Sequence, residues 1–380
     1  MVNLGETVIA KLHAIRNSQR KSLFAILLCI IRCVLRVHSV VSFVTLHFGN
    51  VIKHELDYRT PNEPVRMTIN LTTMSFRKTY ILFLSVWFLS TRGSFAQVSQ
   101  TEGLKKINGT SLYLKTIGQG EPILIVHGGP GMNHSYFIPH LDKLAKKYKI
   151  VFYDQRASGK SSIPSPDSIS LKFFADDIEA IRRELGVEKL NLLAHSWGAI
   201  PAVNYAMYYP AKVGRMILVN PVPLSREFDQ EMLENQRKKV SEGDSTDRSI
   251  ILGSKDFKSG NPDAYKKLLM LSFRHSFYKT TNHSKLKLDM PANYLTASQA
   301  LYAGLGKDLG QYDFYEAVKS FSFPLLIIHG DSDAIPLEAS SKMQRAVPGS
   351  TLVVFKKCGH FAFIEKAGRF RTAVSTFLKK

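Results

Sequence analysis

From Gln97 onward, short apolar runs rich in β-branched residues alternate with stretches of helical period. This alternation predicts an α/β fold with a mostly parallel sheet flanked by helices. Two runs, 123–126 and 325–328, are apolar at every position, as in strands buried on both faces of a parallel sheet. The expected strands are Ser111–Ile117, Pro122–His127, Ile150–Tyr153, Leu190–Ala194, Arg215–Val219, Pro324–His329 and Thr351–Phe355. The expected helices are His134–Lys147, Leu171–Leu185, Trp197–Tyr208, Glu338–Val347 and Phe361–Leu378.

The alternation stops between about Pro221 and Ser322, where the chain is polar, favours helix and contains no convincing central strand. We therefore assign residues 97–221 and 317–380 to the α/β core and residues 222–316 to a helical cap. Open α/β sheets bind ligands at the carboxyl ends of their strands. The cap is thus a candidate for selecting substrates.

Residues 74–96 have the layout of a secretory signal peptide. A basic start at Arg77 and Lys78 precedes about ten apolar residues, and Ser94 and Ala96 supply small side chains before the cleavage point. The alternative is an amphipathic or buried helix. We expect an exported protein, periplasmic or secreted, that starts at Gln97; without this signal it would be cytoplasmic. Residues 1–73 are interpreted as an upstream extension from a start assigned too early, the alternative being a poor membrane anchor at 23–48.

The charge and the cysteine content of the chain exclude several classes of function. The 380 residues carry 51 Lys and Arg against 31 Asp and Glu, a net charge of +20, but the first 96 residues hold 12 of the basic residues against 4 acidic ones. No segment interleaves basic and aromatic residues as nucleic-acid modules do, so we expect no nucleic-acid partner. The three cysteines, Cys29, Cys33 and Cys358, cannot build a disulfide scaffold, and no His/Cys cluster predicts a metal site.

The strongest chemical signal is Ser196, in the run LAHSWGA between a predicted strand and a predicted helix. A tight strand-to-helix turn holds a serine out from the sheet, and the helix N-terminus behind it favours developing negative charge. Gly198 provides the small residue needed two positions later, and Ala194 stands where glycine is usual two positions earlier. Alone, such a serine could also be a helix N-cap.

Two further strand ends supply partners for Ser196. Asp331 and Asp333 follow the strand that ends at His329, and His360 follows the last strand. The chain order Ser196, Asp333, His360 is that of a serine triad in which histidine takes the serine proton and the acid holds the imidazole. We favour Asp333 over Asp331, because the loop must leave the strand before its side chain can reach His360.

The run HGGPG at 127–131 follows the first fully buried strand. Its glycines allow backbone N–H groups to face a substrate oxygen, as an oxyanion hole requires. The N–H groups of Gly129 and Trp197 are the candidates. A phosphate-binding loop is the alternative, but its G-x-G-x-x-G and GK[ST] patterns are absent here.

With these residues in view, the sequence resembles the proline iminopeptidase-like family of α/β-hydrolases. HGGPG at 127–131, DQRASGKSS at 154–162, HSWG at 195–198, GDSD at 330–333 and GH at 359–360 match in order and spacing. The resemblance covers residues 104–380. It implies an α/β-hydrolase fold with a triad of Ser196, Asp333 and His360, an oxyanion hole of Gly129 and Trp197, and no cofactor. It also implies release of an N-terminal residue, often proline, from small peptides, with cap carboxylates holding the free amine.

Two alanines depart from the family pattern, Ala157 and Ala194, and both stand where glycine is usual. The cap glutamates cannot be aligned, so Glu227, Glu231 and Glu234 are only candidates for binding the substrate amine, since charges on a helix are usually solvated. Without an anionic pocket the same triad would serve a carboxylesterase, lactonase or amidase. The alternative outside the enzymes is a non-catalytic binding protein with a hydrolase-like fold. The sequence does not predict the oligomeric state.

Overall fold

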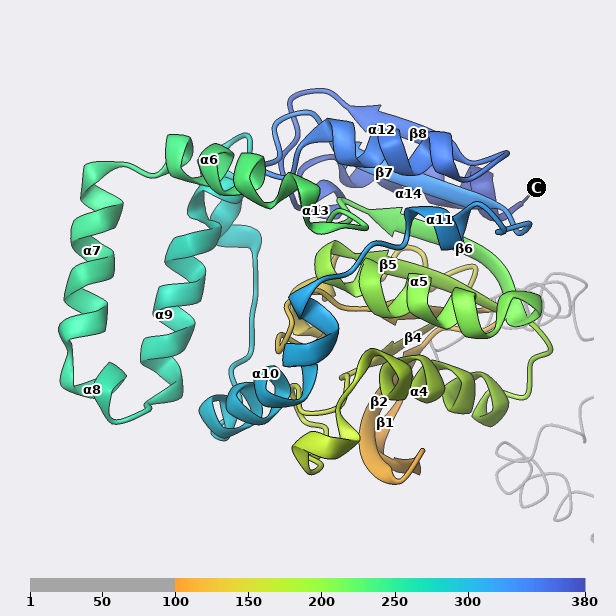
Figure 1. Ribbon diagram of the computed structural model, residues 1–380, viewed down its shortest axis with the longest axis horizontal. Helices are drawn as coiled ribbons and strands as arrows, with labels where there is room; N and C mark the ends of the chain where they lie inside the picture. Colours follow the sequence, from red (N-terminus) through yellow and green to blue (C-terminus); the bar gives the residue numbers. More distant parts are fainter. Residues whose placement is uncertain (1–99, 380) are drawn as a thin grey trace, which may run out of the picture. The chain divides into compact units, whose positions relative to one another are not determined.

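The computed structural model describes residues 100–379 (Figure 1). The predicted signal peptide at 74–96, the upstream segment 1–73 and Gln97 lie outside the described residues, so export stays a prediction. Within 100–379, none of the helices combines the length and the apolar character that a membrane span requires.

The described chain builds one sheet with the strand order β1-β2-β4-β3-β5-β6-β7-β8. β1 pairs antiparallel with β2, and β2 pairs antiparallel with β4. All pairings from β4 through β8 are parallel. The strands are β1 (Gln100–Ile107), β2 (Thr110–Ile117), β3 (Pro122–Val126), β4 (Lys149–Tyr153), β5 (Leu190–His195), β6 (Val213–Val219), β7 (Leu325–Gly330) and β8 (Thr351–Phe355).

All seven expected strands are present, and no strand end is displaced by more than two residues. Every residue of β3 is buried, and its side chains enter two separate apolar clusters on opposite faces of the sheet. This explains its continuous apolar run. The sequence did not predict β1, because nearly all of its residues are exposed and its pattern QTEGLKKI offers no apolar alternation at this edge of the sheet.

Helices cover both faces of the sheet (Figure 1). Residues of α4, α5, α11 and α12 pack in the cluster on one face, and residues of α13 and α14 pack in the cluster on the other. These helices are α4 (Leu171–Glu184), α5 (Ala199–Tyr208), α11 (Tyr315–Val318), α12 (Leu337–Ala346), α13 (Ala362–Glu365) and α14 (Ala367–Leu378).

The prediction of a helix over His134–Lys147 is wrong. Only His134–Phe137 forms a short 3-10 helix, and turns follow it up to β4. Pro139 is the physical reason: it has no N–H to donate, and it disfavours helical backbone at the residue before it. Ile138 accordingly has extended backbone, with φ −91° and ψ 131°.

The segment at 222–316, where a cap is expected, contains five α-helices between β6 and β7. We call this segment the helical insertion. In Figure 1, α7 and α9 run side by side to the left of the core, joined by α8, and α6 connects them to it. The helices are α6 (Asp229–Lys239), α7 (Glu242–Gly253), α8 (Lys255–Lys258), α9 (Pro262–Phe273) and α10 (Tyr294–Gly310).

A buried ion pair joins the loop after β4 to α4. The Arg156 and Asp177 side chains are 1% and 0% exposed, and Arg156 Nε donates to Asp177 Oδ2 at 2.8 Å. Asn108 Nδ2 donates to Asp177 Oδ1 at 2.9 Å. Removing one partner of such a pair leaves an uncompensated buried charge.

We therefore expect Asp177→Asn to lower the free energy of unfolding by about 3–5 kcal/mol. The matched control is Asp176→Asn, whose carboxylate pairs with the exposed Lys172 and should cost about 1 kcal/mol or less. Urea unfolding followed by circular dichroism measures both. Equal losses in the two variants would show that the buried pair is not a principal support of this loop.

Candidate active site

Ser196 lies at the turn from β5 into the short 3-10 helix Ser196–Gly198 that leads into α5. Its φ is 56°, a left-handed conformation that side-chain-bearing residues rarely adopt. The sharp turn separates the serine from the line of the strand, as its place in the sequence predicts. Strain of this kind persists only where the surrounding structure holds it, and such positions cluster at functional sites.

The neighbours of Ser196 must be small. A Cβ on Gly198 would lie 2.4 Å from the Val126 carbonyl oxygen and 2.6 Å from that of His127, at the end of β3. A Cβ on Gly128 would lie 3.0 Å from Ser196 Cβ. The HGGPG loop therefore passes directly beside the serine: only glycine fits at position 198, and a side chain at position 128 would require its neighbours to shift.

His360 follows β8 and is hydrogen-bonded to a carboxylate at the end of β7. His360 Nδ1 lies 2.8 Å from Asp333 Oδ2. Asp331 instead accepts from Ser332 Oγ at 2.9 Å and from the Cys358 N–H at 3.3 Å. The structure thus brings His360 to Asp333, as we favoured, and Asp331 orders the turn.

The carboxylate of Asp333 is buried and fully partnered. Besides His360, it accepts from Asn220 Nδ2 at 2.7 Å and from the Ile335 N–H at 3.2 Å. Burial alone would raise the pKa of Asp333, but its interaction with His360 and the hydrogen bond from Asn220 outweigh burial and hold the pKa below its usual range. An ionised Asp333 keeps the proton of His360 on Nδ1, which leaves Nε2 free to accept one.

The sequence analysis missed Asn220. It directly follows β6, has a left-handed φ of 46°, and its N–H donates to the Ile328 carbonyl at 2.7 Å. A buried asparagine at the end of a buried strand is a signal that could have found it, because asparagine tolerates this conformation and its amide can serve a neighbouring loop.

A chain of buried hydrogen bonds links the three loops around Ser196. The Gly128 N–H donates to Tyr136 Oη at 2.7 Å, and Tyr136 Oη lies 2.9 Å from His195 Nδ1. The His360 carbonyl can only accept, so a neutral His195 carries its proton on Nε2, and its Nδ1 accepts the hydroxyl proton of Tyr136. His195 Nε2–H then donates to the His360 carbonyl oxygen at 3.0 Å. Burial lowers the pKa of His195 well below its usual value, so this imidazole stays neutral.

The DQR motif explains the position of the HGGPG loop. The Gln155 N–H donates to His127 Nε2 at 3.0 Å, and Gln155 Nε2 donates to the His127 carbonyl at 2.7 Å. His127 Nδ1–H is then left to donate to the Gly128 carbonyl at 2.8 Å. Burial lowers the pKa of His127 to about 4, which keeps this arrangement neutral near pH 7.

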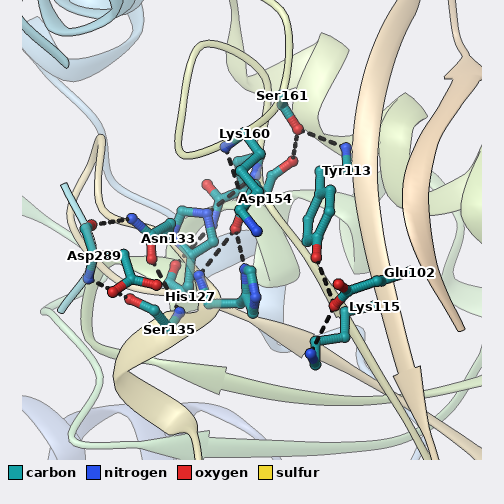
Figure 2. A network of polar contacts seen from close by, with 12 residues as sticks. Glu102, Tyr113, Lys115, His127, Asn133, Ser135, Asp154, Lys160, Ser161 and Asp289 are labelled. Atoms are coloured by element: carbon teal, nitrogen blue, oxygen red, sulfur yellow. Dashed lines mark hydrogen bonds and ion pairs between the residues drawn. The ribbon is translucent and has the colours of Figure 1, made fainter. Parts of the chain in front are cut away.

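Figure 2 shows the adjoining network around Asp154. Its carboxylate accepts from His134 Nδ1 at 2.7 Å and from the Lys160 N–H at 2.9 Å. Asn133 Nδ2 donates to the Asp289 carbonyl at 2.7 Å, and the Asp289 N–H donates to Ser135 Oγ at 2.8 Å (Figure 2). The loop after HGGPG thereby carries one attachment point of the helical insertion.

A cavity of about 800 Å³ opens above Ser196, between the core and the helical insertion. Ser196, Asp333, His360 and Gly129 line it on the core side. Ser196 Oγ makes no hydrogen bond to another described residue. The insertion contributes Val222, Met232, Leu233, Gln236, Arg237, Lys239, Val240, Arg248, Ser272, Phe273, His275 and Ser276.

The two oxyanion candidates occupy the expected loops. Gly129 lines the cavity, with φ 134°, and a Cβ there would meet the Gly131 N at 2.7 Å. The Trp197 side chain instead packs into the core, edge-on to Phe174 at 5.5 Å between ring centroids. Only the backbone N–H of Trp197 lies at this turn, next to Ser196.

None of the three glutamates suggested for amine binding lines this cavity, so that suggestion needs correction. Glu227 is paired with Lys342 at 2.6 Å, and Glu234 accepts from Gln230 at 2.7 Å. Glu231 is exposed. The reason is helical period: 227, 231 and 234 share one face of the segment, whereas the cavity is lined from 232, 236 and 239. Across residues 100–379, no three His, Cys, Asp or Glu side chains form a group that could hold a metal ion.

Comparison with known proteins extends these observations. The family model of the alpha/beta hydrolase fold matches residues 121–367. The chain is 27% identical over 282 residues to a proline iminopeptidase of Lactobacillus crispatus, covering 71% of this chain and 94% of that protein.

Two solved structures share the fold at lower identity. A proline iminopeptidase of Mycobacterium smegmatis is 20% identical with a TM-score of 0.55, covering 73% of this chain and 98% of that one. An esterase of Exiguobacterium antarcticum is 22% identical with a TM-score of 0.55, covering 74% and 100%. By the family match and the observed sheet, this chain belongs to the α/β-hydrolase fold family, in which it is similar to the proline iminopeptidases.

Proposed function

We propose that this protein is a serine hydrolase that forms an acyl-enzyme on Ser196. The observation that carries the proposal is the His360–Asp333 pair, with 2.8 Å between Nδ1 and Oδ2, in the same cavity as the strained Ser196 turn. A neutral imidazole held by an ionised carboxylate is what activation of a serine hydroxyl requires.

In the proposed mechanism Ser196 Oγ attacks the substrate carbonyl carbon while His360 Nε2 takes the serine proton. The backbone N–H groups of Gly129 and Trp197 stabilise the oxyanion of the tetrahedral intermediate. His360 then gives the proton to the leaving group as the acyl–leaving-group bond breaks. Water, deprotonated by His360, attacks the acyl-enzyme and releases Ser196. No step requires a cofactor.

The first substrate class we propose is short peptides, from which the enzyme would release N-terminal residues, with proline favoured. Its support is the similarity to proline iminopeptidases, which extends over nearly their full length. The second candidate is a carboxylesterase, lactonase or amidase. One observation favours it: among the described residues Asp333 is the only carboxylate lining the cavity, and Asp333 is paired with His360, so no acidic group is left for a free amine.

Two substrates separate the candidates: proline β-naphthylamide and p-nitrophenyl acetate. An aminopeptidase should turn over both, whereas ester turnover without amide turnover would leave only the second candidate. A fluorophosphonate probe should label the wild-type protein and not Ser196→Ala, because the probe needs an activated serine. A wild-type protein that never labels would contradict both candidates and favour a non-catalytic binding protein.

The choice of acid can be tested by paired substitutions. Asp333→Asn should lower kcat by about 10⁴-fold, because an amide cannot keep the proton of His360 on Nδ1. Asp331→Asn, two residues away, should change kcat by less than about threefold, since its partners lie in the turn. Steady-state hydrolysis of p-nitrophenyl acetate measures both. A larger loss in the Asp331 variant would overturn the assignment.

The buried hydrogen-bond chain gives a further prediction. Tyr136→Phe removes the acceptor of the Gly128 N–H and the donor to His195, so kcat should fall by about tenfold or more through displaced loops. The matched control is Tyr153→Phe, because the buried Tyr153 hydroxyl has no hydrogen-bond partner among the described residues. Its activity should stay near that of the wild type. Similar kcat values for the two variants would refute a positioning role for Tyr136.

A further inference from the structure

The cavity above Ser196 is strongly basic on the side of the helical insertion. Arg237 and Lys239 come from α6, and Arg248 comes from α7. Among the described residues that line the cavity, only Asp333 is acidic. Because Asp333 is committed to His360, the lining has an excess of positive charge facing the space where a substrate must lie.

The two guanidinium groups have no competing anion. Within residues 100–379, neither Arg237 nor Arg248 forms an ion pair or a side-chain hydrogen bond. Lys239 differs, because its Nζ donates to the Ser332 carbonyl and burial lowers its pKa. Lys239 therefore adds positive charge to the cavity while its ammonium group is already held in place.

Asp244, which is hydrogen-bonded to the cavity-lining His275, does not offset this charge. It accepts from His275 Nε2, with 2.5 Å between the atoms, and from Arg274 Nη1 at 2.8 Å, and it caps α7 through Ser241. These partners hold the pKa of Asp244 below its usual range, so it is ionised and fully engaged. Its charge is used within the helical insertion itself.

The rest of the insertion's lining is mainly apolar, including Val222, Met232 and Phe273. Apolar walls with a few placed charged groups are typical of sites for small molecules. A ligand that fits this lining has an apolar body near Ser196 and an anionic end. Guanidinium groups suit carboxylates in particular, because their planar N–H groups can donate two parallel hydrogen bonds.

We propose that Arg237 and Arg248 bind a carboxylate of the substrate, so that the enzyme prefers substrates with a free carboxylate over analogues in which that carboxylate is an ester or an amide. This inference rests on the proposed function, since it takes Ser196 as the nucleophile in the same cavity. The carboxylate can belong to an ester or amide of a dicarboxylic acid, or to the C-terminus of a dipeptide. Both present the same group to the arginines.

Two matched pairs of substrates test the preference and distinguish its sources. One pair is 4-nitrophenyl hydrogen glutarate and its methyl ester, and the other is prolyl-alanine and prolyl-alaninamide. We expect kcat/KM to be at least about tenfold higher for the member of one pair that has the free carboxylate, because a charge-assisted hydrogen bond is worth more than about 1.4 kcal/mol. The pair that shows the preference identifies the source. Equal kcat/KM values within both pairs would overturn the proposal.

Substitutions locate the effect. Arg237→Gln and Arg248→Gln should each lower the charged-to-neutral ratio of kcat/KM by about fivefold to tenfold, mainly through a higher KM for the charged substrate. The control is Lys238→Gln, which removes the same charge from α6 at a position outside the cavity lining and should leave the ratio unchanged. If Lys238→Gln lowers the ratio as much, general surface charge explains the preference and the carboxylate site is refuted.

Binding separates this inference from the proposed function. Calorimetric titration of the Ser196→Ala variant with the same two glutarate esters requires no turnover. Tighter binding of the charged ester, lost in Ser196→Ala/Arg237→Gln, supports the site even if the wild-type protein neither hydrolyses the esters nor labels with a fluorophosphonate. Binding of the neutral ester that is equally tight, or no binding of either, contradicts the carboxylate site whatever the catalytic result.

Discussion

The arrangement around Ser196 depends on one buried chain of hydrogen bonds, from the Gly128 N–H through Tyr136 and His195 to the His360 carbonyl. Each member needs the next, because an unpaired polar group in a dry interior costs about 1–3 kcal/mol. The chain joins the HGGPG loop, the turn after β5 and the loop after β8, which are far apart in sequence. Three loops that could each move independently are thereby held in one relative position, which proton transfer between them requires.

The site residues that the sequence predicted lie at the ends of buried strands. Parallel strands bring their carboxyl ends to one edge, so motifs that follow β3, β5, β7 and β8 must meet there whatever their separation along the chain. This is why Ser196, Asp333 and His360 could be chosen before their distances were known. Ala157 also becomes understandable: its φ of 54° requires the conformation that glycine adopts freely, at a cost of about 1 kcal/mol for alanine.

The residues that sequence reasoning missed or misplaced act through three-dimensional packing instead. In the sequence, Tyr136 looks like any other residue of an apolar segment. Only the structure shows that its hydroxyl lies between Gly128 and His195. In the helical insertion, the rotation of α6 about its axis determines which side chains line the cavity. Neighbouring residues can differ completely: Glu231 is exposed, whereas Met232 lines the cavity. A polar helix with little amphipathic pattern does not reveal that rotation. The acidic residues could therefore be identified, but not the face that they occupy.

The core and the helical insertion have different roles: the core holds the proposed reacting groups, and the insertion supplies most of the cavity lining. The proposed reacting groups lie at strand ends and on loops fixed by buried hydrogen bonds, where a small displacement is costly. The contacts between the insertion and the core include Asp289 with Ser135 and the Ser276 carbonyl with the His360 N–H at 2.7 Å. Side chains on the inner face of α6 and α7 can change without disturbing those bonds. The same fold can thus present an arginine-lined cavity beside the proposed reacting groups, and similarity over the core alone does not determine the charge of the substrate.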